Sequence, residues 1–290
     1  MINLRLDNLK KSFHSQEVLS GIDLKMESSD GRIIGVIGKN GAGKSTLFKI
    51  LSNIDKDYTG SFICEMNTAI KLGFLPEERS LPKFGSISDI LLLWARIQGV
   101  EKADLNNKME YWFKRVQLWE LRGEKITSLS KGNQQKLQLA CALIHEPNLI
   151  IFDEPFSGLD PNNQELVIDI LNQFKNQGAL ILLSAHQLEL VERISDICYL
   201  LTNGILDTIE PIRHNKNKNL LVECYDPTSL DGTSATLVKE HTYLIELENL
   251  GSNEKLILFE LISKDTISII KNNNLRNVFL EKLQQGESNE

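Results

Sequence analysis

The sequence has few cysteines and no long apolar run. Its four cysteines are widely spaced along 290 residues and form no C-x-x-C pair, so neither a disulfide framework nor a zinc site is indicated. The longest apolar stretches, at 90–95 and 179–183, fall far short of the roughly 20 residues of a membrane-spanning helix. The first residues alternate like a strand and lack the basic region and apolar run of a signal peptide. We therefore expect a cytosolic chain that reaches a membrane only through a partner.

An excess of positive charge is also absent. The formal net charge is −7, so general attraction to nucleic acid or to anionic lipid is not expected. With 41% hydrophobic and 24% charged residues, the composition is that of an ordinary globular protein. The length is sufficient for one large core or for two domains.

A glycine-rich loop at residues 38–45, Gly-Lys-Asn-Gly-Ala-Gly-Lys-Ser, lies between a strand pattern at 32–37 and a helical pattern at 43–51. Its glycines let backbone N–H groups converge on phosphate oxygens, and the helix adds the positive end of its dipole. We expect Lys44 to reach the β- and γ-phosphates, Ser45 to bind Mg²⁺, and Thr46 to support the α-phosphate side. The predicted phosphate-binding set is Gly38, Asn40, Gly41, Ala42, Gly43, Lys44, Ser45 and Thr46.

Two carboxylates, Asp153 and Glu154, follow an apolar strand pattern at 149–152. In open α/β sheets, ligands bind at the carboxyl edge, where buried strands end. We expect Asp153 to hold Mg²⁺ through its water shell and Glu154 to orient and polarise the attacking water. Positioning and charge neutralisation supply most of the catalysis in phosphoryl transfer. A strand that simply ends in a polar turn is the alternative, and the upstream phosphate loop disfavours it.

Strand and helix patterns alternate along most of the chain, which predicts an α/β fold with a largely parallel sheet. Helices are expected at 161–176 and 187–194, between core strands. Residues 86–145 instead show helical spacing, in segments 86–98, 103–118 and 132–145, and form a candidate inserted helical subdomain. The expected strands are 3–9, 18–26, 32–37, 69–75, 149–152, 179–184 and 196–201.

A polar stretch at 213–219 without apolar periodicity is interpreted as a linker, which divides the chain into domains at 1–212 and 213–290. Beyond the linker, strands are expected at 220–225 and 243–247 and a short helix at 275–285. These elements predict a small C-terminal α+β domain.

The segment 129–136, Leu-Ser-Lys-Gly-Asn-Gln-Gln-Lys, lies between the phosphate loop and the two carboxylates. In this order the motifs resemble those of ATP-binding cassette (ABC) ATPases, with residues 129–133 in place of the family's L-S-G-G-Q signature. The resemblance covers about residues 1–210. It implies a P-loop NTPase cassette with a mostly parallel core sheet, N-terminal antiparallel strands and an inserted helical subdomain. It also implies that Ser130 and the backbone of Gly132 contact the γ-phosphate of ATP held by another subunit.

Several of these residues have a second interpretation. Ser130 also fits an ordinary helix cap. Phe13 resembles the family's adenine-stacking aromatic, and a core or rim phenylalanine is the alternative. Asp160 ends a segment, 157–160, that resembles the family's D-loop, where a turn before a helix is the alternative. His186 resembles the switch histidine that hydrogen-bonds the γ-phosphate, and a structural histidine is the alternative.

The chain departs from the family pattern at three positions. Glu77 stands where the family usually has the Q-loop glutamine, and an ionised carboxylate can bind Mg²⁺ or water but cannot donate a hydrogen bond. Lys131 replaces a glycine of the signature and Asn133 replaces its glutamine. Lys131 would add positive charge near the partner's nucleotide, or it is a solvated surface lysine.

The resemblance implies an ATPase that uses ATP and Mg²⁺ and closes as a dimer on two ATP molecules to drive a permease. The F-L-P-E-E-R stretch at 74–79, the L-S-K-G form and the ending at 275–281 are similar to bacterial subunits that pair with ABC-2-type permeases, mostly exporters. The implied partners are a second copy, or a related ATPase, and a separate integral-membrane permease docked near Glu77 and 86–145. The implied location is the cytoplasmic face of the cell membrane.

Two other functions remain as alternatives. A non-transport ABC ATPase would act as an ATP-gated clamp on ribosomes or nucleic acid, which the negative net charge and the single phosphate loop disfavour. A module that senses ATP without cleaving it is disfavoured by Glu154, which is placed to activate water.

Overall fold

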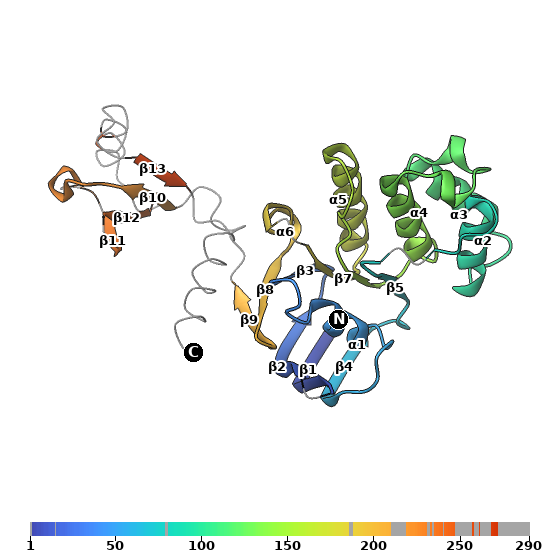
Figure 1. Ribbon diagram of the computed structural model, residues 1–290, viewed down its shortest axis with the longest axis horizontal. Helices are drawn as coiled ribbons and strands as arrows, with labels where there is room; N and C mark the ends of the chain where they lie inside the picture. The colour runs from blue at the N-terminus through green and yellow to red at the C-terminus, as the bar shows by residue number, and fades with distance from the viewer. Residues whose placement is uncertain are drawn as a thin grey trace. The chain divides into compact units, whose positions relative to one another are not determined.

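The computed structural model of the chain divides into two compact units, Met1–Ile209 and Glu210–Glu290 (Figure 1). It describes residues 2–209 apart from 15, 79, 80, 186 and 187. Beyond residue 209 it describes residues 219–230, 233, 235–239, 241–246, 257, 261 and 268–271.

An antiparallel three-stranded sheet opens the first unit, in the order β2-β1-β4. It contains β1 (Ile2–Phe13), β2 (Gln16–Ser28) and β4 (Thr59–Met66). In β1, alternate side chains are buried, which is the pattern of a strand with one face on the core. The strand β4 was not predicted, because its side chains are only half-buried or exposed and show no clear alternation of apolar residues.

A six-stranded sheet forms the centre of the first unit, in the order β5-β6-β7-β3-β8-β9. Its parallel strands are β3 (Arg32–Ile37), β5 (Leu72–Leu75), β6 (Leu149–Phe152), β7 (Leu180–Ser184) and β8 (Ile197–Thr202). Every residue of β6 and β7 is buried, as expected for strands covered on both faces. The predicted α/β class with a mostly parallel sheet is therefore confirmed.

The sheet ends in an antiparallel strand, β9 (Ile205–Ile209), that the sequence analysis did not predict. It follows β8 through a two-residue turn, Asn203-Gly204, with φ of 50° and 75°. Two residues with positive φ are typical of the type I′ turn that closes hairpins. The carbonyl of Gly204 also accepts a hydrogen bond from the Ser20 amide at 2.8 Å, which joins this hairpin to β2.

The helix α1 (Lys44–Leu51) lies in the core between the two sheets. Its Leu47 and Phe48 belong to the same buried cluster as Leu6 of β1 and Ile151 of β6. Because α1 begins where the glycine-rich loop ends, this packing fixes the loop at the carboxyl edge of the central sheet.

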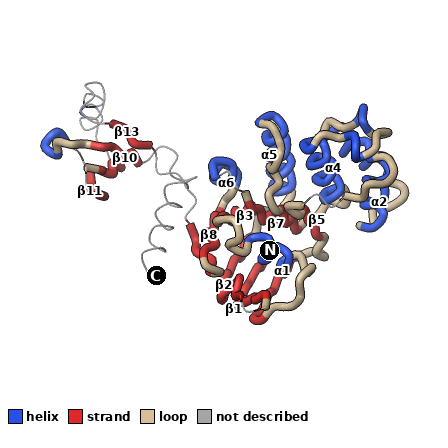
Figure 2. The backbone as a smooth tube through the Cα atoms, viewed as in Figure 1, coloured by secondary structure: helices blue, strands red, loops and turns tan. Residues whose placement is uncertain are grey.

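Three helices form a separate group within the first unit, at the side away from β1 and β2 (Figure 2). They are α2 (Ile87–Ile97), α3 (Leu105–Arg115) and α4 (Lys131–Leu143). Ser86 and Asp89 cap the start of α2 reciprocally, as in a capping box. The later helices are α5 (Pro161–Asn176) and α6 (Leu188–Ile194). Trp112 of α3 stacks on Phe174 of α5, with ring centroids 6.3 Å apart.

The second unit contains a four-stranded antiparallel sheet, in the order β11-β12-β10-β13. Its strands are β10 (Asn219–Glu223), β11 (Ala235–Lys239), β12 (Thr242–Glu246) and β13 (Ser268–Lys271). Val222, Cys224, Leu230 and Ile245 form its buried cluster. The helix predicted at 275–285 lies outside the described residues. Among the residues described in both units, no helix is long and apolar enough to cross a bilayer.

Candidate nucleotide-binding site

The glycine-rich loop connects β3 to α1, and its glycines are required for different reasons. Gly41 and Gly43 have φ of 81° and 103°, a region that residues with a side chain rarely adopt. A Cβ atom on Gly38 would lie 2.5 Å from the carbonyl oxygen of Leu201, so the close approach of β8 requires glycine there. Gly43 caps α1 without any side-chain acceptor, so the first N–H groups of the helix are available to an anion.

Lys44 is the first residue of α1 and is 7% exposed. Its ammonium group donates to the carbonyl oxygens of Gly38 at 3.0 Å and Lys39 at 3.2 Å. These neutral acceptors hold the cation over the loop. Phosphate oxygens in the loop would replace them with charged acceptors, which form stronger hydrogen bonds with an ammonium group.

Asp153 and Glu154 follow β6 and are both buried. The Asp153 amide donates to the carbonyl oxygen of Leu75 at 2.8 Å, which brings the end of β5, and Glu77 beyond it, to the same place. Glu154 has φ of 54°, in the left-handed region that is unusual for a residue other than glycine. Such backbone outliers are concentrated at functional sites, where the surrounding structure holds them.

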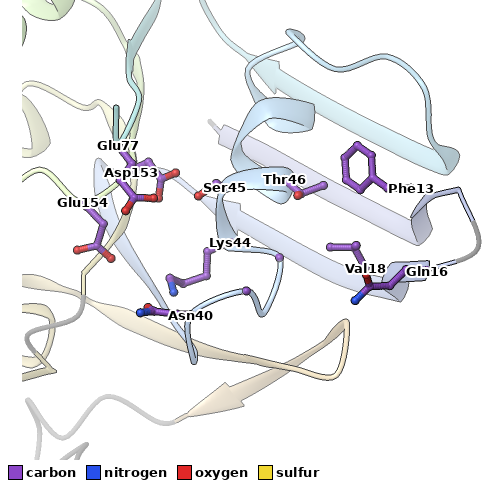
Figure 3. Close-up of a pocket in the computed structure, with 12 residues that line it drawn as sticks. Phe13, Gln16, Val18, Asn40, Lys44, Ser45, Thr46, Glu77, Asp153 and Glu154 are labelled. Carbon is purple, nitrogen blue, oxygen red and sulfur yellow. The ribbon is translucent and has the colours of Figure 1, made fainter. Parts of the chain in front are cut away.

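One cavity of about 550 Å³ brings most of the predicted site residues together (Figure 3). The carboxylates Glu77, Asp153 and Glu154 lie at one end, and Phe13 lies at the other. Lys44, Ser45 and Thr46 lie between these ends. The cavity is lined by Phe13, Gln16, Val18, Asn40, Gly41, Gly43, Lys44, Ser45, Thr46, Glu77, Asp153 and Glu154. Gly38 and Ala42 belong to the same loop but do not line the cavity.

Along the cavity, these groups follow one another in the same order as the base and the phosphates of a nucleoside triphosphate. Phe13, at the end of β1, is 48% exposed, so its ring is available to a base, and it is not a core residue. The loop and the start of α1 follow, where the phosphates would lie. The carboxylates are beyond them, where water would attack the terminal phosphate.

The donor atoms at the carboxylate end fit Mg²⁺. The Ser45 hydroxyl and the carboxylates of Asp153 and Glu77 supply oxygen, which is the ligand type that Mg²⁺ prefers. Within the described part of the chain, no group of three or more His, Cys, Asp or Glu residues could hold a metal alone. A cation here would depend on phosphate and water ligands, as Mg²⁺ bound with a nucleotide does.

The signature residues Ser130, Lys131, Gly132 and Asn133 do not line this cavity. Ser130 is exposed, and its hydroxyl accepts a hydrogen bond from the Asn133 amide at 3.2 Å, so it caps α4. Lys131 is also exposed. The cap interpretation and the anion-site interpretation of Ser130 are compatible, because a capped helix start still presents its other N–H groups.

Asp160 likewise lies outside the cavity and caps α5. Its carboxylate accepts from the Asn163 amide at 3.0 Å, and this backbone hydrogen bond lowers the Asp160 pKa. The neighbouring Gly158 approaches α4, where a Cβ atom on Gly132 would lie 3.3 Å from the Gly158 carbonyl oxygen. His186 falls outside the described residues.

The structure adds residues that the sequence analysis did not identify. Gln16 and Val18 line the base end of the cavity, because the β1–β2 hairpin pairs Phe13 with Gln16. Gln135 of α4 donates to the carbonyl oxygen of Pro155 at 3.2 Å. Ser184 contacts both Asp153 and Glu154. For Ser184 the sequence held one signal, a single polar residue at the end of an apolar strand.

Comparisons with known proteins agree with this geometry. Residues 20–157 match the family model described as ABC transporter. The chain is 40% identical over 201 residues to an uncharacterised ABC transporter ATP-binding protein of Methanocaldococcus jannaschii, covering 69% of this chain and 74% of the relative. A linearmycin resistance ATP-binding protein of Bacillus subtilis is 25% identical over 273 residues, covering 91% and 85%.

A solved structure described as the ATP binding subunit of an ABC transporter has the same fold. It superposes with a TM-score of 0.65 at 29% identity, covering 73% of this chain and 92% of that one.

Proposed function

Because the chain belongs to the ABC transporter ATP-binding proteins, a family of ATPases, we propose that it hydrolyses ATP as one half of a dimer that drives a separate membrane permease. One observation carries the proposal. The cavity contains the phosphate loop, the carboxylates and the aromatic residue, while Ser130 and Gly132 lie outside it. If the signature is to contact ATP, a second subunit must supply it.

Within one subunit, the adenine base stacks on Phe13 and the phosphates lie on the loop at 38–45. Lys44 balances the charge of the β- and γ-phosphates. Ser45, Asp153 and Glu77 would hold Mg²⁺, which would supply further positive charge at the phosphates. Glu154 orients the attacking water and accepts its proton. From the second subunit, Ser130 and the backbone of Gly132 contact the γ-phosphate. Asp160 belongs to the segment that links the two sites across the dimer, and His186 hydrogen-bonds the γ-phosphate and so distinguishes ATP from ADP.

Closure is then a shift of population toward a dimer that has higher affinity for ATP than the open form. Hydrolysis removes the γ-phosphate that both subunits contact, so the dimer reopens. All parts of the site occur in one chain, which makes a homodimer simpler than a pair with a related ATPase.

An apolar groove supports the permease as a partner. It has a volume of about 270 Å³ and lies between the helical group and the β5 end of the central sheet, next to Pro76 and Glu77. Ile54, Phe74 and Trp94 are among its lining residues. Among the residues that the structure describes, the side-chain atoms Trp94 Nε1, Gln98 Oε1 and Gln138 Oε1 have no hydrogen-bond partner. The mostly apolar lining would receive a permease segment with an apolar face.

An exporter is the transporter class favoured by the similarity to the linearmycin resistance protein, which extends over 91% of the chain. The permease would hold this ATPase at the cytoplasmic face of the cell membrane.

The test is purification of the tagged chain from membranes solubilised in mild detergent. We expect an integral membrane protein to co-purify and to stimulate ATP hydrolysis. Recovery with ribosomes or nucleic acid instead would overturn the transport proposal and favour an ATP-gated clamp. In the same preparation, Lys44→Ala should lose ATP binding, whereas Lys49→Ala, which removes an exposed lysine of the same helix, should retain it.

A further inference from the structure

A buried serine connects the two carboxylates of the cavity. Ser184, the last residue of β7, is 0% exposed. Its hydroxyl donates to Asp153 Oδ1 at 2.6 Å and accepts a hydrogen bond from the Glu154 amide at 3.0 Å. One hydroxyl therefore contacts two consecutive residues of another strand's end, one through the side chain and one through the backbone.

The position of Ser184 follows from the strand pairing. The strands β6 and β7 are parallel neighbours, with Phe152 opposite Leu183. The next residue of each strand, Asp153 after Phe152 and Ser184 after Leu183, is therefore at the same level of the carboxyl edge, and the two residues lie side by side. A serine can use both bonds at once, because a hydroxyl is a donor and an acceptor together. Alanine in this position would keep the size of the buried residue but neither bond.

We propose that Ser184 is a positioning residue for ATP hydrolysis, a role that rests on the proposed function of Asp153 and Glu154. The bond to Oδ1 restricts rotation of the Asp153 carboxylate, so its orientation toward a metal-bound water is fixed before nucleotide binds. The bond from the Glu154 amide holds that residue in its left-handed conformation, with φ of 54°. Both carboxylates are thereby set by one side chain that does not itself contact ATP.

The experiment compares Ser184→Ala with Ser195→Ala. Ser195 is equally buried, and its hydroxyl has no hydrogen-bond partner among the described residues, so it controls for the loss of a buried hydroxyl. We expect Ser184→Ala to lower kcat about 10- to 100-fold, since small misplacement of catalytic groups has effects of that size. The KM for ATP should change less than about threefold, and Ser195→Ala should leave both constants unchanged.

A second measurement does not depend on turnover. The affinity for a fluorescent ATP analogue is measured with Mg²⁺ and with EDTA. Ser184→Ala should weaken binding only when Mg²⁺ is present, because a disordered Asp153 affects the cation and not the phosphate loop. Equal losses in both conditions would indicate a general structural defect and would overturn the inference.

Further variants keep the test decisive. Ser184→Thr retains the hydroxyl and should recover much of the lost kcat. If alanine prevents folding, Ser184→Cys keeps the size with a much weaker hydrogen-bonding group and should show the same loss. A wild-type kcat in Ser184→Ala would overturn this inference about Ser184 but would leave the proposed function intact. A wild-type chain that neither binds nor hydrolyses ATP would instead overturn the proposed function.

Discussion

The ammonium nitrogen of Lys11 lies over the Phe13 ring, 4.9 Å from its centroid. Lys11 is buried, and it is held by the carboxylates of Asp55, at 3.0 Å, and Asp57, at 3.2 Å. The cation therefore has a fixed place beside the ring proposed to stack the base. A cation over an aromatic face is attracted by the ring quadrupole, which restrains the ring.

Replacement of Lys11 should weaken nucleotide binding without changing the chemical step. In Lys11→Met we expect ATP affinity to fall about 2- to 5-fold, which corresponds to a cation–π contribution of roughly 0.5–1 kcal/mol. The kcat at saturating ATP should be unchanged. Lys25→Met, which removes an exposed lysine of β2 paired with Glu27, is the control. A parallel loss of kcat would contradict a role confined to the base.

Removal of the Glu154 charge should separate binding from hydrolysis. Glu154→Gln keeps the shape but provides no base for water, so we expect kcat to fall about 100-fold or more. ATP binding should persist, and a dimer should accumulate in size-exclusion chromatography with ATP. Glu146→Gln is a matched control, because Glu146 also has φ of 54° but pairs with Lys108 at the surface. Unchanged hydrolysis in Glu154→Gln would remove Glu154 from its assigned role.

Lys131 is exposed and stands where the family has glycine, so its charge should act only on a second subunit. We expect Lys131→Gly and Lys131→Met to raise the ATP concentration for half-maximal dimer formation, measured in the Glu154→Gln background. A shift of about 2- to 5-fold corresponds to an exposed charge interaction of up to roughly 1 kcal/mol. Lys114→Met, at an exposed lysine paired with Glu110 in α3, should cause no shift. If Lys131 variants behave like that control, Lys131 is a surface lysine.

His145 should make the first unit less stable in mild acid. Its Nε2 atom lies 3.0 Å from the Leu72 carbonyl oxygen, which requires the proton there. Its Nδ1 atom is buried and has no hydrogen-bond partner within the described part of the chain. Burial lowers the His145 pKa, and Lys71 and Lys108 lower it further. The unfolded chain, with a histidine pKa of about 6.5, therefore takes up this proton before the folded chain does.

The contribution of neutral His145 is thus complete above about pH 6.5 and is lost as the pH falls toward the lowered pKa of the folded state. His145→Gln should flatten the pH dependence of the unfolding free energy in this window, measured by urea denaturation. An unaltered slope in His145→Gln would contradict this account.

The sequence was sufficient for the fold class because the phosphate loop and the buried strands have local patterns. The strand at 32–37 and the helix at 161–176 lie where their periodicity predicts them. The strand expected at 69–75 begins only at Leu72, because Lys71 bonds to the turn at Asn148 through both its N–H and carbonyl groups. The β8–β9 hairpin had a usable signal, the Asn203-Gly204 pair, which the sequence analysis did not use.

The site was predicted less completely, because its missing members depend on which strands are neighbours. Lys44 and Asp153 each belong to a motif whose own residues lie within a few positions of one another, so a local pattern identifies them. Ser184 contacts Asp153 only because β7 lies beside β6, and no local pattern encodes that order. Gln16 reaches the cavity through the register of the β1–β2 hairpin, which is likewise a property of the pairing.

The helix α4 begins at the signature, and two of its later side chains contact the segments that carry the carboxylates of the same subunit. Ser130 caps its start, Gln135 donates to the Pro155 carbonyl oxygen, and Gln138 donates to that of Pro76 at 3.4 Å. In the proposed dimer, a change at Pro155 would displace the signature that faces the other subunit's ATP. In each subunit, the helix α4 would then connect that subunit's own hydrolysis site to the signature that faces the other subunit's ATP. Such a connection makes the occupancy of one site alter the affinity of the other, so ATP hydrolysis by the dimer should be cooperative.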